Sequence, residues 1–246
     1  MKGARRKPSA AKQIRPFWVL LLVLGVAAGA IGAFIVAWPG FAPKQVSVTG
    51  NRVVPAAEIA ARARVEPRVN MWLQNTGSME ARVRAIPYIA SAAVYRVPPA
   101  TVVIAVRERA PFAVMRSGDA SVLVDRDLRV LSEVDANGSL PVFVVRPGVM
   151  LDPGNFVNDT QGRELRDDYD AMIAAHVVPL ELSFDRFGGL VATVRGGVRI
   201  LLGDDSDFQK KLALVNPVLS QLVHDRRRVA AVDLRAPSTP VLVWRK

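Results

Sequence analysis

Side chains that could carry out chemistry are few in this chain, and they stand apart from one another. The chain has two histidines, His176 and His224, and no cysteine. The distance between them in sequence does not fit a helical zinc site, and thiolate ligands are excluded. Ser9 and Lys12 have the S-x-x-K spacing of a serine nucleophile with a lysine base, but they lie in a basic N-terminal arm without a supporting motif. We therefore expect both histidines in capping or surface positions at helix ends.

The acidic and glycine-rich segments also lack the neighbouring sequence that a metal-binding or phosphate-binding site requires. The acids at 204–207 precede a predicted helix, whose N-terminal dipole accounts for them without a metal. The acids at 167–170 lie on a predicted helix and lack the alternating spacing and the glycine of a calcium loop. Glycine pairs at 188–189 and 196–197 separate predicted strands, whereas a phosphate-binding loop precedes a helix. The sequence thus predicts no catalytic, cofactor-binding or metal-binding residue, no small-molecule substrate and no enzymatic activity.

Without a chemical site, the elements around these side chains are expected to serve in recognition. The sequence from residue 44 to residue 110 predicts one small module. Alternating and helical patterns give a strand, two helices and two strands. They are Lys44–Gly50, a helix from Pro55, a helix over about Ser78–Ile86 with Ser78 as N-cap, Ser91–Val97 and Thr101–Glu108. This β-α-α-β-β order predicts two helices on one face of a three-stranded sheet.

From Pro111 onward, short apolar runs recur between turn signals, which is typical of a β-rich domain. The expected strands are Phe112–Arg116, Ser121–Asp125, Arg129–Ser132, Pro141–Val145, Val178–Phe184, Leu190–Arg195, Val198–Leu202, Ala230–Arg235 and Pro240–Lys246. One helix is expected over about Thr160–His176. A second begins where Ser206 and Gln209 have the spacing of a capping box, and it closes at Arg226–Arg228. The fold class is therefore α+β, with two helices in this domain.

An uncharged stretch near the N-terminus predicts a membrane span. Phe17–Trp38 holds 22 residues without a charge. As a helix this stretch would be roughly 33 Å long, enough to cross a hydrocarbon core of about 30 Å. Trp18 and Trp38 lie at its two ends, where aromatic rings prefer the headgroup level. A cleaved signal peptide is the alternative, but its apolar region is shorter, and Trp38-Pro39-Gly40-Phe41 is a poor cleavage site.

Charge predicts the orientation of the span. The basic side chains before it, without any acid, are Lys2, Arg5, Arg6, Lys7, Lys12 and Arg15. Only Lys44 and Arg52 follow it closely, so the positive-inside rule places the arm, residues 1–16, in the cytoplasm. The arm also contributes six of the net charge of +11, which would attract anionic lipid. Nucleic-acid binding is the alternative, but the arm has no aromatic side chain to stack on bases, so we predict no nucleic-acid partner.

Several short stretches follow one another in a recognisable order behind the span: Val46–Asn51, Ile86-Pro87 with Ala92–Pro98, Thr101–Pro111, Val124-Asp125, Leu202-Gly203, Lys211-Leu212, Pro217–Leu219, and Val232–Arg235 with Trp244. In these stretches and in the order of its parts, the chain resembles the FtsQ family of bacterial cell-division proteins, called DivIB in Gram-positive bacteria. Each stretch alone is weak, but their order behind one span is specific. The resemblance implies a POTRA-like domain over 44–110 and an FtsQ-type β domain over 111–246.

This sequence departs from the family pattern at three places. Val97 replaces a tryptophan before the proline of the first hairpin, and the turn Asp125–Leu128 lacks its usual glycine. Ala236 stands where the family has an aromatic residue at a partner-binding position, whereas Trp244 is retained.

The resemblance implies a non-enzymatic scaffold of the divisome, the cell-division machinery, that links early cytoplasmic and late periplasmic components and helps to control septum formation. Its implied partners are FtsB and FtsL, two small membrane proteins that form a coiled coil. It further implies a single-pass protein of the inner membrane at the division site, with its main domains in the periplasm. The POTRA-like module is expected to dock other division proteins. A membrane-anchored envelope enzyme and a POTRA-containing outer-membrane assembly factor are the alternatives.

The last predicted strand offers a physical route to such binding. Pro240–Lys246 would end the sheet, and an edge strand can accept a strand from another chain. Val241 and Val243 are expected on one face, with Leu242 and Trp244 on the other. The predicted partner-binding residues are Asp233, Arg235, Ala236, Ser238, Val241, Leu242, Val243 and Trp244. For Asp233 and Arg235, a salt bridge that only holds the last hairpin is an equally good interpretation.

Overall fold

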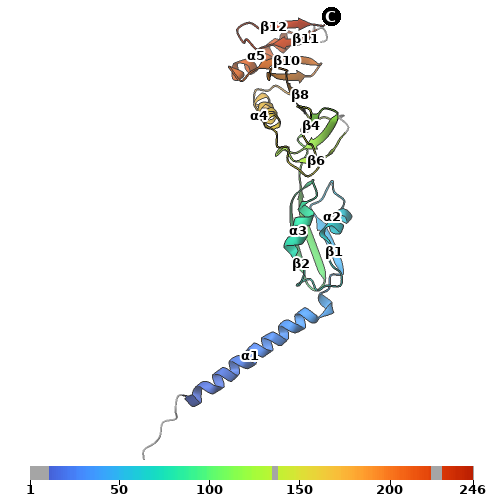
Figure 1. The fold of residues 1–246 in the computed structure, drawn as a ribbon, viewed down its shortest axis with the longest axis vertical. Helices are drawn as coiled ribbons and strands as arrows, with labels where there is room; N and C mark the ends of the chain where they lie inside the picture. Colours follow the sequence, from blue (N-terminus) through green and yellow to red (C-terminus); the bar gives the residue numbers. More distant parts are fainter. Residues whose placement is uncertain (1–10, 135–137, 223–228, 246) are drawn as a thin grey trace, which may run out of the picture. The chain divides into compact units, whose positions relative to one another are not determined.

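The computed structural model describes residues 11–134, 138–222 and 229–245 of the chain (Figure 1). It divides into two compact units. The first contains the chain up to Arg84 together with Ser91–Arg107, and the second contains Ala85–Ala90 and the chain from Glu108 onward.

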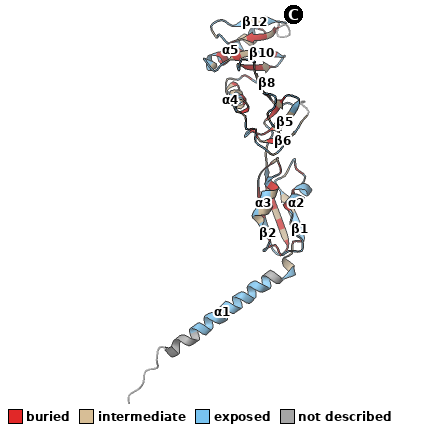
Figure 2. Ribbon diagram, in the orientation of Figure 1, coloured by how far each residue is buried: buried red, intermediate tan, exposed pale blue. Residues whose placement is uncertain are grey.

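The N-terminal helix α1 spans Ala11–Ala37. It begins six residues before the uncharged stretch and ends just before Trp38, so its first turns include charged residues of the arm. Within it, Phe17–Ile35 is long and apolar enough to cross a membrane, and its side chains are exposed (Figure 2). A 3-10 turn, η1 (Pro39–Phe41), follows, because Pro39 cannot continue the helical hydrogen bonds.

The POTRA-like module has the predicted β-α-α-β-β order. Its elements are β1 (Gln45–Thr49), α2 (Ala56–Ala63), α3 (Thr76–Arg84), β2 (Ile89–Val97) and β3 (Thr101–Glu108). They form a three-stranded sheet of order β1-β3-β2, in which β1 runs parallel to β3. Val102, Ile104 and Val106 alternate as buried side chains on β3, as the period-two pattern predicts.

The start of α3 differs from the prediction. The helix begins at Thr76 rather than after Ser78, because Asn75 provides the side-chain acceptor. Asn75 Oδ1 accepts the Ser78 N–H at 3.1 Å, and the Ser78 hydroxyl donates back to the Asn75 carbonyl at 2.8 Å. Ser78 is therefore inside the first turn and is not the N-cap.

The second unit contains a mixed nine-stranded sheet. Its strands are β4 (Ala113–Ser117), β5 (Ala120–Val124), β6 (Val130–Glu133), β7 (Val142–Val145), β8 (Pro179–Phe184), β9 (Leu190–Val194), β10 (Val198–Gly203), β11 (Val229–Asp233) and β12 (Val241–Trp244). Their order is β12-β11-β10-β9-β8-β7-β4-β5-β6. Helices α4 (Thr160–Ala174) and α5 (Phe208–Gln221) pack against it, α4 on β7 and β8 and α5 on β10.

One buried cluster extends through this sheet and both helices (Figure 2). It joins the fully buried Phe143 of β7 and Leu182 of β8 to Leu165 of α4 and Leu212 of α5. Burial of each such side chain contributes roughly 2 kcal/mol of hydrophobic free energy relative to its exposure. The helices thus hold the sheet through one core, and the ends of the strand order remain as the two edges.

The predicted capping box at the start of α5 is wrong. The helix begins at Phe208, and Asp207 before it has a positive φ of 53° with no side-chain cap. The Ser206 hydroxyl instead donates to Asp204 Oδ1, so it is turned away from the helix. The predicted closure at Arg226–Arg228 lies outside the described residues.

Candidate partner-binding edge

The last two strands form the edge that the sequence predicts. β11 pairs parallel with β10 and antiparallel with β12, and Val232 lies opposite Leu242. Both strands are shorter than predicted, and their loop contains Ala236 and Ser238, both exposed. Among the described strands, none pairs with the outer side of β12. Its outer backbone groups are thus available to a strand from another chain.

The side chains of β12 divide into one inward and three exposed residues. Leu242 is partly buried and packs against the core cluster. Val241, Val243 and Trp244 are 51%, 45% and 52% exposed. Trp244 was expected to share the face of Leu242 but does not share its burial. The register between Val229 and Ala231 is irregular, and this shift lies opposite Val243 and Trp244, where strict alternation is lost.

The opposite edge of the same sheet is covered where its strand begins. A segment at 154–157 runs beside β6, where the Val130 N–H donates to the Asn155 carbonyl at 2.9 Å and the Gly154 N–H donates to the Val130 carbonyl at 2.8 Å. Arg129 and Phe156 form an antiparallel bridge in the same place. The two edges therefore differ in backbone satisfaction as well as in apolar exposure.

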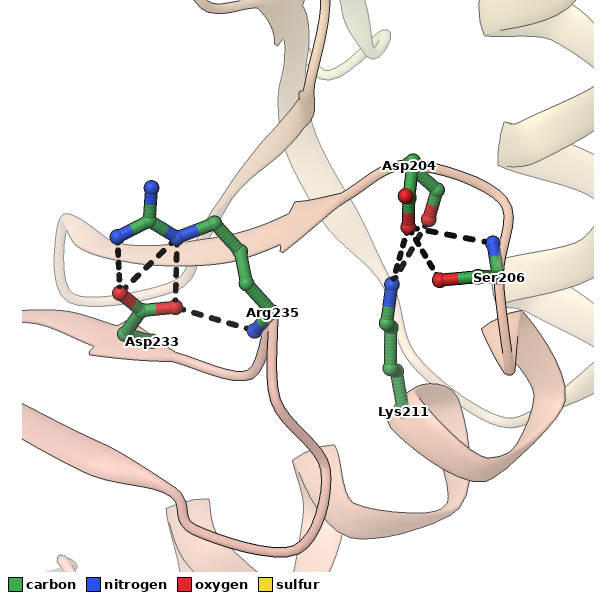
Figure 3. A network of polar contacts seen from close by, with 5 residues as sticks. All are labelled: Asp204, Ser206, Lys211, Asp233 and Arg235. Atoms are coloured by element: carbon green, nitrogen blue, oxygen red, sulfur yellow. Dashed lines mark hydrogen bonds and ion pairs between the residues drawn. The ribbon is translucent and has the colours of Figure 1, made fainter.

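Asp233 and Arg235 make a close ion pair at the end of β11 (Figure 3). The Arg235 guanidinium Nε donates to both carboxylate oxygens of Asp233, at 3.0 and 3.1 Å, and the Arg235 backbone N–H donates to Oδ1 at 3.0 Å. These hydrogen bonds from Arg235 lower the pKa of Asp233, against the opposing effect of burial. The pair fixes the exit of the chain into the loop, while the exposed face of Arg235 remains open to solvent.

A buried lysine behind this edge was missed by the sequence analysis. Lys211 of α5 is fully buried, and its ammonium donates to the backbone carbonyl of Asp204 at 2.8 Å and to Oδ1 of Asp204 at 3.1 Å (Figure 3). The Ser206 hydroxyl, and then Lys211, lower the pKa of Asp204. The burial of Lys211 could have been predicted from its spacing, because it lies three residues after Phe208 and therefore falls on the apolar stripe of its helix.

The remaining polar candidates do not assemble into a chemical site. His176 lies at the end of α4, as predicted, and its carbonyl accepts a hydrogen bond from the Asn216 amide at 3.2 Å. His224 lies outside the described residues. Across the described ranges, no group of three histidine, aspartate or glutamate side chains is arranged to hold a metal ion.

Comparison with known proteins defines the class and then the family. A family model described as POTRA domain, FtsQ-type, matches residues 41–109, so the first module is of a kind found in cell-division proteins. A second, described as Cell division protein FtsQ/DivIB, C-terminal, matches residues 113–235, half of the chain. The chain belongs to the FtsQ/DivIB family of cell-division proteins.

Individual relatives agree with this assignment. Cell division protein FtsQ of Syntrophotalea carbinolica is 29% identical over 86% of this chain and 76% of the relative. FtsQ of Mycolicibacterium smegmatis is 32% identical over 83% of this chain and 59% of the relative. DivIB of Clostridium acetobutylicum is 22% identical over 82% of this chain and 83% of the relative. The family, together with the one membrane-length apolar helix among the described residues, indicates a single-pass protein of the inner membrane with a role in the divisome.

Proposed function

We propose that this protein is a non-enzymatic scaffold of the divisome that binds FtsB, in its coiled coil with FtsL, through the open edge at β12. A strand or extended segment of FtsB adds beside β12 and completes its backbone hydrogen bonds. Trp244 provides the apolar anchor, since a large exposed aromatic beside an open edge is the kind of residue that dominates binding energy. The observation that supports this proposal is the contrast between the open, apolar β12 edge and the covered β6 edge.

The proposed topology follows from the charges around α1. The basic arm stays in the cytoplasm, and the POTRA-like module and the second unit lie in the periplasm. The scaffold then links early cytoplasmic division proteins to the periplasmic complex that controls septal wall synthesis. The POTRA-like module docks other division proteins in the same compartment.

The test is the binding of FtsB to the detergent-solubilised full chain, measured for wild type and Trp244→Ala. Binding should weaken by about tenfold or more, which corresponds to about 1.4 kcal/mol. Phe187→Ala is the matched control, because Phe187 is also an exposed aromatic on this unit, in the turn between β8 and β9, and should leave binding unchanged.

A second variant tests the edge rather than the anchor. Deleting residues 240–246 should abolish binding in a protein whose circular dichroism still reports the fold. Intact binding by that deletion variant would overturn the β12 site, and failure of wild type to bind FtsB would overturn the proposed partner.

A further inference from the structure

A side-chain hydrogen bond joins the C-terminal end of α1 to the POTRA-like module. The Trp38 N–H still donates to the Phe34 carbonyl at 2.9 Å, but the next helical acceptor, the Ile35 carbonyl, would need the N–H that Pro39 lacks. Asn70 supplies the missing donor, because its side-chain Nδ2 lies 2.8 Å from the Ile35 oxygen. A carbonyl at the end of an apolar span is costly to leave unsatisfied, so this contact ties the module to the helix end.

Asn70 belongs to a loop, Glu66–Gln74, which we call the exit loop, and this loop is held internally by buried polar groups. The same Asn70 side chain accepts the Trp72 N–H at 2.9 Å through Oδ1. Gln74, also buried, donates to the Glu66 carbonyl at 2.7 Å and accepts the Glu66 N–H at 3.0 Å. These hydrogen bonds between buried polar groups therefore fix the conformation of the exit loop.

Arg96 of β2 and Phe41 fix the exit loop against the rest of the module. The Arg96 guanidinium donates to the Met71 carbonyl at 2.8 Å and to the Gln74 carbonyl at 2.6 Å. The Met71 N–H donates to the Phe41 carbonyl at 2.9 Å. Since Phe41 follows Trp38 by only three residues, the exit loop is held beside the end of the span.

This well-held loop nevertheless exposes its largest apolar side chains. Trp72 is 46% exposed and Leu73 is 58% exposed, while the polar Asn70 and Gln74 are buried. The Trp72 ring packs edge-on against Phe41, with centroids 6.4 Å apart, and Phe41 packs on Trp38 at 5.0 Å. The aromatic series that begins at the end of the span thus continues onto the module.

A second apolar turn lies at the same end of the module. Both the Lys44 N–H and the Gln45 N–H, at the start of β1, donate to the Ala100 carbonyl, which places the β2–β3 turn beside the exit from the span. That turn exposes Val97 and the two prolines at 98–99. Exposed Lys44 and Arg68 add positive charge nearby, which suits anionic headgroups.

We propose that the exit loop is a lipid-binding surface: Trp72 and Leu73 insert into the interfacial region of the membrane that α1 crosses, and Asn70 clamps the loop to the end of the span. This proposal rests on the membrane anchoring stated under the proposed function. Tryptophan prefers the headgroup level, and the added leucine gains hydrophobic free energy there. The membrane is the occupant because the patch is continuous with the residues that leave it.

The test uses the absence of native cysteine, which permits single nitroxide labels on the full chain in phosphatidylethanolamine–phosphatidylglycerol vesicles. Labels at Leu73→Cys, Val53→Cys and Ala28→Cys are compared by their collision rates with oxygen, which enriches in lipid, and with a water-soluble nickel chelate on both sides of the membrane. Val53 is the matched control, since it is equally exposed but follows β1 at the other end of the module. Ala28 reports the span itself.

The oxygen-to-nickel ratio at Leu73 should exceed that at Val53 severalfold and approach the ratio at Ala28. Equal ratios at Leu73 and Val53, with Ala28 in lipid, would overturn the lipid-binding surface and leave the anchor standing. A water-like ratio at Ala28 would overturn the anchoring and this proposal with it.

Asn70→Asp tests the hydrogen bond from Asn70 to the Ile35 carbonyl separately from the hydrogen bond that holds the exit loop itself. The aspartate can still accept the Trp72 N–H but cannot donate to the Ile35 carbonyl. In the Leu73→Cys background the ratio should fall toward the Val53 value, and an unchanged ratio would overturn the role of Asn70.

Discussion

The two edge strands of the nine-stranded sheet, β6 and β12, differ in whether another segment of the chain pairs with their outer backbone groups. At β6 the chain folds back on itself, so that the segment at 154–157 takes the outer hydrogen bonds of Val130 at the start of the strand. At β12 the described chain provides no such cover, and three of the four side chains are exposed and apolar. Proteins usually guard an exposed edge with charge, proline or a covering segment. An edge left apolar within a molecule that covers part of the other one is the observation that supports the proposed partner site.

The largest expected effect on partner binding comes from placing a lysine on each edge in turn. Val243→Lys should weaken FtsB binding by about tenfold or more, because a lysine at an open apolar edge opposes strand addition and would lose hydration on binding. Glu133→Lys, on the covered strand β6, should leave binding unchanged. Titration of labelled FtsB against both variants checks this contrast, and an equal loss in the two would show that the difference between the edges does not determine binding.

The side chain that supports the open edge from behind should have the largest effect on stability. Lys211→Ala removes a fully buried side chain and its hydrogen bonds to Asp204, and should lower the free energy of unfolding by about 2–4 kcal/mol. Lys210→Ala is the neighbouring control, because Lys210 is exposed and pairs with Asp207 at the surface, where such pairs contribute little. Urea unfolding of the two variants would contradict this expectation if both lost the same stability.

A smaller effect should depend on pH and concerns the helices that cover the sheet. Burial first, and then the charge of Asp205, raise the pKa of Asp168 on α4 to about 6 from its ordinary value of 3.8. Between these values the folded protein holds a proton that the unfolded chain has released, so stability falls as pH rises through this window. Because Asp168 is only half-buried, solvent screening limits the effect to about 1 kcal/mol.

Asp168→Asn should therefore be more stable than wild type at pH 7.5 and show no such gain near pH 4. Chemical unfolding at the two pH values measures the difference. A gain of equal size at both would mean that the carboxylate charge is not its cause.

Sequence patterns predicted the parts of the fold that depend on local periodicity. The alternation in β3, the order of the POTRA-like module and the edge position of the last strand are all confirmed. The cover of β6 could not be predicted, because it joins Val130 to Asn155 across many residues without a repeating pattern. The parallel pairing of β10 with β11 has the same non-local character.

The predicted helix starts were wrong where two neighbouring polar side chains could each act as the hydrogen-bonding group at the start of the helix. Ser78 was predicted to cap α3, but Asn75 provides an acceptor one turn earlier. Ser206 was predicted to cap α5, but Asp204 binds its hydroxyl and is itself bound by the buried Lys211. Such choices depend on tertiary contacts that a linear pattern does not contain. The predicted partner-binding residues are gathered at one edge by the fold, and their role stays a prediction.

The smallest expected effect distinguishes the two interpretations of Asp233 and Arg235. If the pair only holds the loop after β11, Asp233→Asn should cost a few tenths of a kcal/mol, since Arg235 is exposed and solvent screens the pair, and should change FtsB binding by less than about twofold. The lowered pKa of Asp233 makes this stabilisation fully present above about pH 4 and lost as pH falls through the folded pKa, so wild type and variant should converge in acid. A loss of binding near tenfold at pH 7, with unfolding unchanged, would instead make Asp233 part of the partner contact and extend the open edge beyond β12 to the end of its neighbour.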